Sequence, residues 1–137
     1  MTNTTDRAPA FVDEPEGFAS TYPAPFVAGV RTLAERISSL QFARHRNAGR
    51  PEDLAERWST VRIRPRRRFV AIDIDTSGAY LVEVKTGEVV GIKAYGVPNY
   101  RHRYGNISDT SRFAWGAYRT PTKSREAPIP VAGGVTP

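Results

Sequence analysis

The sequence of 137 residues contains no cysteine, which excludes disulfide frameworks, thiolate zinc sites and cysteine nucleophiles. Its two histidines, His45 and His102, are far apart and flanked by arginine, which disfavours a zinc site built on histidine. No apolar run is long enough for a transmembrane helix, and the first residues do not follow the pattern of a secretory signal. We therefore expect a cytoplasmic protein with no membrane partner, no metal and no cofactor.

Lysine is scarce as well, because the chain has 17 Arg but only 3 Lys, for a net charge of +6. A GC-rich genome would explain the number of arginines but not their positions. Residues 44–68 carry nine Arg against Glu52, Asp53 and Glu56, and residues 99–125 carry a net charge of +5. The positive charge therefore lies in two blocks, and the arginine side chain suits contacts with phosphate or carboxylate groups.

The two ends of the chain differ in composition from its middle. Residues 1–25 contain four prolines and four acidic residues but a single base, Arg7. Residues 119–137 contain four more prolines and the pair Gly133-Gly134. We predict a disordered acidic tail over 1–25, a second disordered tail over 119–137, and one α+β domain over 26–118.

The domain is predicted to begin with helices. Apolar residues recur there at spacings of three and four: Phe26, Val30, Leu33, Ile37 and Leu40. This stripe indicates a helix that starts near Pro25 and stops before Gly49, and we favour packing on the chain's own domain over a coiled-coil or partner-binding face. Pro51 opens a second, shorter helix over 51–60, on which Leu54 and Trp58 share a face.

The apolar period changes to two after residue 60, which indicates strands. Val61 and Ile63 alternate with Arg62 and Arg64, and residues 69–75, 80–85 and 89–94 alternate likewise around turns at 76–78 and 86–87. We predict a small antiparallel meander of three to four strands, packed by one or two N-terminal helices. After Pro98 the alternation weakens, and we expect a basic aromatic loop over 100–106.

The arginine blocks are interleaved with aromatic residues, as binding to a single-stranded nucleic acid requires, because arginines neutralise phosphates and aromatic rings stack on bases. The candidate residues are Arg62, Arg64, Arg66, Arg67, Arg68, Tyr100, Arg101, Arg103 and Tyr104. They would form one surface only if the strand register brings the two blocks together. The alternatives are an acidic protein partner, or a solvated face whose aromatic rings turn into the core.

Enzymatic activity is predicted to be absent. Residues 69–78, FVAIDIDTSG, are similar to the first phosphate loop of actin-like ATPases and to the first strand of ribonuclease-H-like nucleases, in which an aspartate binds metal. The ATPase loop needs glycine where Asp75 stands, and after the meander only Asp109 and Glu126 remain as further carboxylates for a nuclease. A metal-dependent nuclease using Asp73 is the minor alternative, and the simpler interpretation puts Asp73 and Asp75 on the solvent face at a turn.

Residues 85–98, KTGEVVGIKAYGVP, lead into Arg103-Tyr104-Gly105-Asn106-Ile107. The segment Lys85–Ile107 resembles a part of small phage-encoded proteins of uncharacterised function, as does Trp115-Gly116 in an aromatic patch. The resemblance implies a phage or mobile-element origin and assigns no catalytic residues.

The sequence thus predicts a basic accessory protein, not an enzyme, that contacts nucleic acid. The alternative is a protein-interaction or virion-structural component that docks through Phe11–Phe18 or through the stripe of the first helix. The oligomeric state and a preference for DNA or RNA are not predicted.

Overall fold

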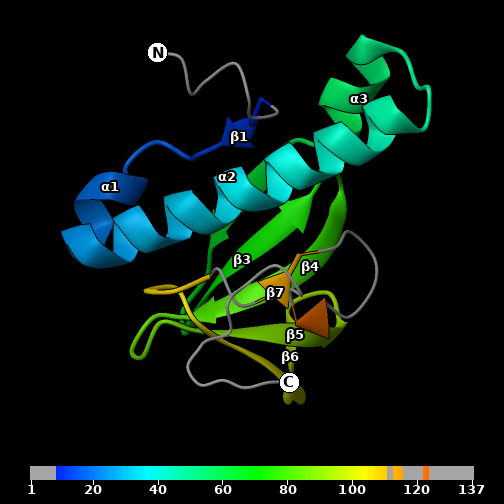
Figure 1. The fold of residues 1–137 in the computed structure, drawn as a ribbon. Coiled ribbons are helices and arrows are strands. Elements are labelled where there is room, and N and C mark those ends of the chain that lie inside the picture. The colour runs from blue at the N-terminus through cyan, green and yellow to red at the C-terminus, as the bar shows by residue number, and fades with distance from the viewer. Residues whose placement is uncertain (1–8, 111–112, 116–121, 124–137) are drawn as a thin grey trace.

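A computed structural model of the chain describes residues 9–110, 113–115 and 122–123 (Figure 1). Its α+β architecture has a short first strand, then two short helices and one long helix, then five further strands that complete a six-stranded sheet. The elements follow in the order β1 (Val12–Asp13), α1 (Phe18–Thr21), α2 (Ala24–Asn47), α3 (Glu52–Trp58), β2 (Val61–Pro65), β3 (Phe69–Ile74), β4 (Ser77–Glu83), β5 (Glu88–Ala94), β6 (Val97–Asn106), β7 (Phe113–Ala114) and β8 (Thr122–Lys123). Among the helices of these residues, none has the length and apolar character that crossing a membrane requires.

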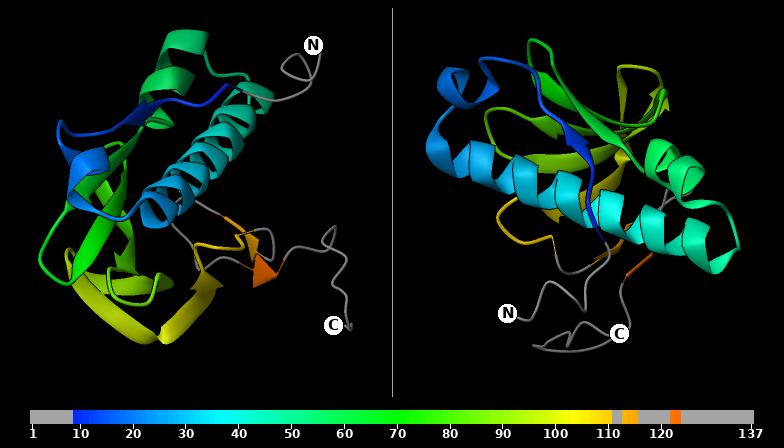
Figure 2. Two further views of the ribbon diagram at one scale, coloured as in Figure 1. Left: turned by 90° about the vertical axis from the view of Figure 1, so that its left-hand side faces the viewer. Right: turned by 90° about the horizontal axis from the view of Figure 1, so that it is seen from above.

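Helix α2 lies along one face of the sheet, as the helical stripe predicts (Figures 1 and 2). Val30, Leu33 and Ile37 are fully buried against the sheet, and Leu40 is partly buried beside them. Gly49 ends the helix with a φ of +84°, a conformation that glycine adopts without steric cost. The prediction that this stripe packs on the chain's own domain is therefore confirmed for the described residues, and so is the second helix, α3.

The sheet has the order β1-β2-β3-β4-β5-β6, and all its pairs are antiparallel except the parallel pair β1·β2. Val70, Ile72 and Ile74 of β3 alternate toward α2 and form the main core with the helix. Residues from β6 and from the segments that follow it complete this core. Tyr104, Ile107 and Trp115 belong to the same buried cluster. Burial of this apolar surface is the main force that holds the helix on the sheet.

The predicted meander of three to four strands has too few strands, because β6 extends the meander where a basic loop was expected. Strand β6 runs over Val97–Asn106 and pairs with β5. The register between the two strands shifts at Glu88/Val90, Val90/Gly91 and Ile92/Ala94. Each irregularity changes which side chains face the core, so the alternation that signals a strand disappears from the sequence.

The predicted N-terminal tail contains ordered structure in its described part, residues 9–25. Phe18 is only 2% exposed, and β1 pairs with β2 at Val12 and Val61. A bidentate contact of Arg31 with Glu14, at 2.6 and 2.7 Å, fixes the segment to α2 and lowers the pKa of the Glu14 carboxyl. The composition of this segment does not reveal its order, because the contacts that stabilise it are tertiary. Residues 1–8 lie outside the described residues, as does the predicted C-terminal tail apart from 122–123.

Candidate nucleic-acid interface

The sheet face that points away from α2, called the outer face below, carries a second and smaller apolar cluster. All six residues of β3 are buried although α2 covers only one face of the sheet (Figure 2). Phe69, Ala71, Leu81 and Val90 form the cluster, and Ile92 packs against it. Since no helix of the described residues lies on this face, the polar and aromatic side chains around the cluster must cover it.

Two arginines reach the outer face from β2. Val61 and Ile63 are buried in the core under α2, so Arg62 and Arg64 point to the opposite side, as the alternation predicts. Arg62 contacts Asp13 at 2.9 Å and also donates a hydrogen bond to the carbonyl of Asp75. Arg62 is therefore held by the N-terminal segment and is less available to a ligand than the other arginines.

The turn between β2 and β3 supplies three consecutive arginines. The Arg66 guanidinium lies over the ring of Tyr95, 5.0 Å from its centroid. The Arg68 guanidinium lies 5.4 Å from the centroid of the Phe69 ring and 3.7 Å from a Glu83 carboxylate oxygen. Arg67 is exposed in the same turn. The turn thus brings cations and aromatic rings together at one end of the outer face.

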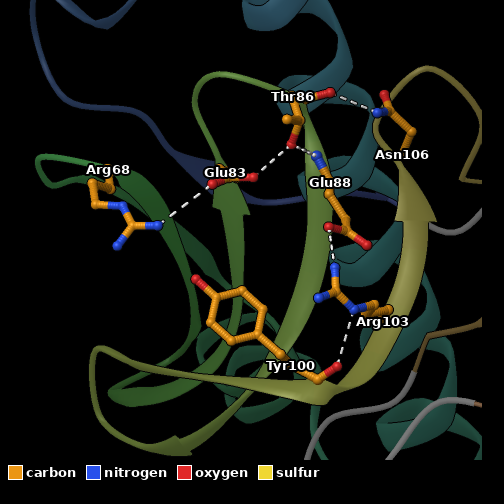
Figure 3. A network of polar contacts seen from close by, with 7 residues as sticks. All are labelled: Arg68, Glu83, Thr86, Glu88, Tyr100, Arg103 and Asn106. Atoms are coloured by element: carbon orange, nitrogen blue, oxygen red, sulfur yellow. Dashed lines mark hydrogen bonds and ion pairs between the residues drawn. The ribbon is translucent and has the colours of Figure 1, made fainter.

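Strand β6 brings the second arginine block to the same face. Arg103 forms an ion pair with Glu88 at 2.6 Å, and its guanidinium lies 5.2 Å from the centroid of the Tyr100 ring. Figure 3 shows Arg68 and Arg103 on either side of β4 and β5, with Glu83 and Glu88 between them. Arg101 is exposed on the same strand. The two blocks therefore share the outer face, with carboxylates interposed between them.

In three of the ion pairs on the outer face, the arginine is far more exposed than its carboxylate partner. The exposed fractions of the side chains are 52% and 4% for Arg64 and Asp73, 70% and 22% for Arg68 and Glu83, and 52% and 27% for Arg103 and Glu88. A ligand approaching the face meets the guanidinium groups first. The carboxylates beneath hold these groups in place, which lowers the entropy lost when a ligand binds them.

Asp73 is buried, so the expectation that it lies on the solvent face is wrong. It is 3% exposed and accepts a 2.8 Å hydrogen bond from the Tyr95 hydroxyl, and Arg64 Nε lies 3.3 Å away. Its Oδ1 atom has no hydrogen-bond partner among the described residues. Asp75, by contrast, does form the turn, with a φ of 55°. In the described part of the chain no three His, Asp or Glu side chains cluster as a metal site would require.

Tyr104 does not belong to the exposed surface on which it was predicted. It is 5% exposed, and its ring packs edge-on against Tyr80 and Trp115, with both centroids 5.9 Å away. Tyr95 takes the exposed place that was expected for Tyr104, since Tyr95 is 52% exposed and contacts Arg66. The sequence signal that could have identified Tyr95 is its position directly before Gly96, a turn residue with a φ of +76°. A large residue at such a turn, beyond the last strand pair, projects from the sheet.

Neither a model of a protein family, nor a curated protein, nor a solved structure matches this chain. The geometry of its own residues is therefore the basis for a functional proposal. The resemblance of Lys85–Ile107 to phage-encoded proteins stays a prediction.

Proposed function

We propose that the protein, which we take to be no enzyme, binds single-stranded nucleic acid on the outer face of its sheet. The guanidinium groups of Arg64, Arg66, Arg67, Arg68, Arg101 and Arg103 contact phosphates, and the rings of Tyr95 and Tyr100 stack on bases. The predicted phage or mobile-element origin suits an accessory protein of this kind.

The observation that carries the proposal is the presence of two arginine–tyrosine pairs on one exposed face. Arg66 lies against Tyr95 and Arg103 against Tyr100, at 5.0 and 5.2 Å from the ring centroids. These rings are 52% and 41% exposed, although most aromatic side chains of a small domain lie in its core. A tyrosine beside a guanidinium offers a base a stacking surface and offers the adjacent phosphate a cation.

The pairs favour a single strand over a duplex. In a duplex the base faces are stacked on one another, so only phosphates and groove edges can reach a protein surface. A single strand can turn its bases onto the tyrosines while its backbone follows the arginines. Stacking on a tyrosine is tolerant of base identity, so we expect little dependence on sequence from this contact alone.

Tyr100→Leu tests the proposal, with Tyr100→Phe as the matched control that keeps the ring. Stacking of one base contributes about 1–3 kcal/mol, so Tyr100→Leu should weaken binding of a labelled mixed-sequence single strand by about tenfold. Tyr100→Phe should bind within about twofold of wild type. Fluorescence anisotropy at about 50 mM salt measures both. Equal affinities of the Leu and Phe variants would contradict the stacking role.

A second candidate function is docking of an acidic protein, and one observation favours it. Among the described residues, the exposed large apolar side chains are Tyr95, Val97 and Tyr100, which all lie on β6 or in the turn that precedes it. A partner that supplies carboxylates and an apolar contact would fit them, including a partner within a virion. If folded, monodisperse protein binds no single strand or duplex at about 50 mM salt, this candidate replaces nucleic-acid binding. Absence of nucleic acid in the purified protein before a high-salt wash would point the same way.

A further inference from the structure

Two acidic side chains lie between the arginine blocks on the outer face, at the end of the sheet where the turn over 84–87 joins β4 to β5. The β4–β5 register pairs Leu81 with Val90 and Val82 with Val89, which sets Glu83 opposite Glu88 on neighbouring strands. Like charges in directly opposed positions destabilise a sheet. Glu83 also accepts a 2.8 Å hydrogen bond from the Thr86 hydroxyl, and each carboxylate has an arginine beside it (Figure 3).

The two carboxylates hold arginines in place, but they also repel phosphates, which a surface that served only to attract phosphates would avoid. The pair lies between Arg68 and Arg103, where a phosphate backbone crossing directly from one block to the other would pass. Both carboxylates are partly exposed, at 22% and 27%. They therefore face any ligand that spans the two blocks, and they repel its negative charges.

We infer that Glu83 and Glu88 exclude ligands that offer only phosphates and so make the outer face selective for single strands over duplexes and polyphosphate. This inference rests on the proposed function. Selectivity through repulsion of the wrong ligand is a general device of specific surfaces. A single strand avoids the repulsion because its backbone can move away from the sheet over the carboxylates while its bases turn inward.

Turned inward, the bases also give the carboxylates a favourable contact. The amino groups of cytosine, adenine and guanine donate hydrogen bonds, and a carboxylate accepts them, as acidic side chains do from cytosine in duplex grooves. A line of phosphates offers no such donor. The same two side chains therefore oppose one ligand and tolerate the other.

The test is the double variant Glu83→Gln/Glu88→Gln, which keeps the size of both side chains and the acceptor for Thr86. The control is Glu52→Gln/Glu56→Gln, which makes the same change in charge on two exposed residues of α3. Affinities for a labelled single strand and for the matching duplex are measured by anisotropy, with inorganic polyphosphate as a competitor. Thermal unfolding of each variant monitors folding.

We expect the outer-face variant to bind duplex and polyphosphate about 5- to 25-fold more tightly than wild type. Repulsion between a carboxylate and a phosphate in contact across water weakens binding by about fivefold, and the variant removes two carboxylates. Single-strand affinity should change by less than about threefold, and the α3 control by less than about twofold for every ligand. The ratio of duplex to single-strand affinity therefore rises only in the outer-face variant.

The failures of the two proposals are distinguishable. If wild type binds the single strand but the duplex-to-single-strand ratio is the same in both double variants, the exclusion role is wrong and the proposed function stands. If the outer-face variant binds every ligand more weakly, the carboxylates act only by orienting arginines, and the exclusion role is again wrong. Failure of wild type to bind any nucleic acid overturns both.

Discussion

Tyr95→Phe removes a single hydroxyl, which donates a 2.8 Å hydrogen bond to Oδ2 of Asp73. Asp73 is 3% exposed, and its Oδ1 already lacks a hydrogen-bond partner among the described residues. After the change, Oδ2 keeps only the contact with Arg64 Nε at 3.3 Å. A hydrogen bond to a charged group contributes about 1.5–3 kcal/mol. Because the Tyr95 side chain is half-exposed, water can replace part of this bond, and we expect a loss of about 2 kcal/mol.

Urea unfolding followed by far-ultraviolet circular dichroism measures this loss. The midpoint should fall while the slope m stays unchanged, because the folded surface is the same. Tyr100→Phe is the matched control and should lie within about 0.5 kcal/mol of wild type, as surface substitutions usually do. Tyr95→Phe keeps the ring over which Arg66 lies, so the single-strand affinity of Tyr95→Phe should stay within about twofold of wild type. A free energy of unfolding equal to that of the control would refute the role given to the hydroxyl.

Three further changes test the core and its ionisable groups. Leu33→Asp should abolish the circular-dichroism signature of the fold, because Leu33 is fully buried and the carboxylate would have no partner; a folded variant that loses self-association would instead mark an interface. Phe18→Ala should lower the free energy of unfolding by about 3–5 kcal/mol and admit proteolysis within residues 9–25, whereas a change under about 1 kcal/mol would show that this segment is not packed. Burial and the nearby Arg50 lower the pKa of His45 from its usual 6.5. The stability that depends on neutral His45 is therefore complete above pH 6.5 and is lost as the pH falls from 6.5 through the lower pKa of the folded state. His45→Gln should show less of this loss in urea titrations at pH 5 and pH 7.5.

Helices α2 and α3 and strands β2 to β5 could be predicted from the sequence because their apolar residues recur at a helical or a strand period, whereas α1 lies in a segment predicted to be disordered. The spacing from Phe26 to Ile37 indicates α2, and the alternation from Val61 to Ile74 indicates β2 and β3. Strand β6 could not be predicted, since its register shifts against β5 remove the period of two. The strand β1 was missed for a different reason, because it is two residues long and is stabilised by tertiary contacts.

The candidate site shows the same division. The outward orientation of Arg62 and Arg64 follows from strand alternation alone. Whether Tyr100 or Tyr104 is exposed depends on the bend and register of β6, which placed Tyr104 in the core. The carboxylates beneath the arginines could not be found from the sequence, because Asp73 and Glu83 reach them only through strand pairing.

The salt dependence of single-strand binding tests the central claim most directly. Six exposed arginines in contact with phosphates predict a slope of log affinity against log salt of about −4, at about −0.7 for each contact. Replacing Arg66, Arg67 and Arg68 by alanine should reduce the slope by about 2 without unfolding the protein, since these side chains are exposed. The control replaces three exposed arginines of the helices, Arg36, Arg44 and Arg57, and should leave the slope unchanged. Equal slopes for the two triple variants would contradict binding on the outer face.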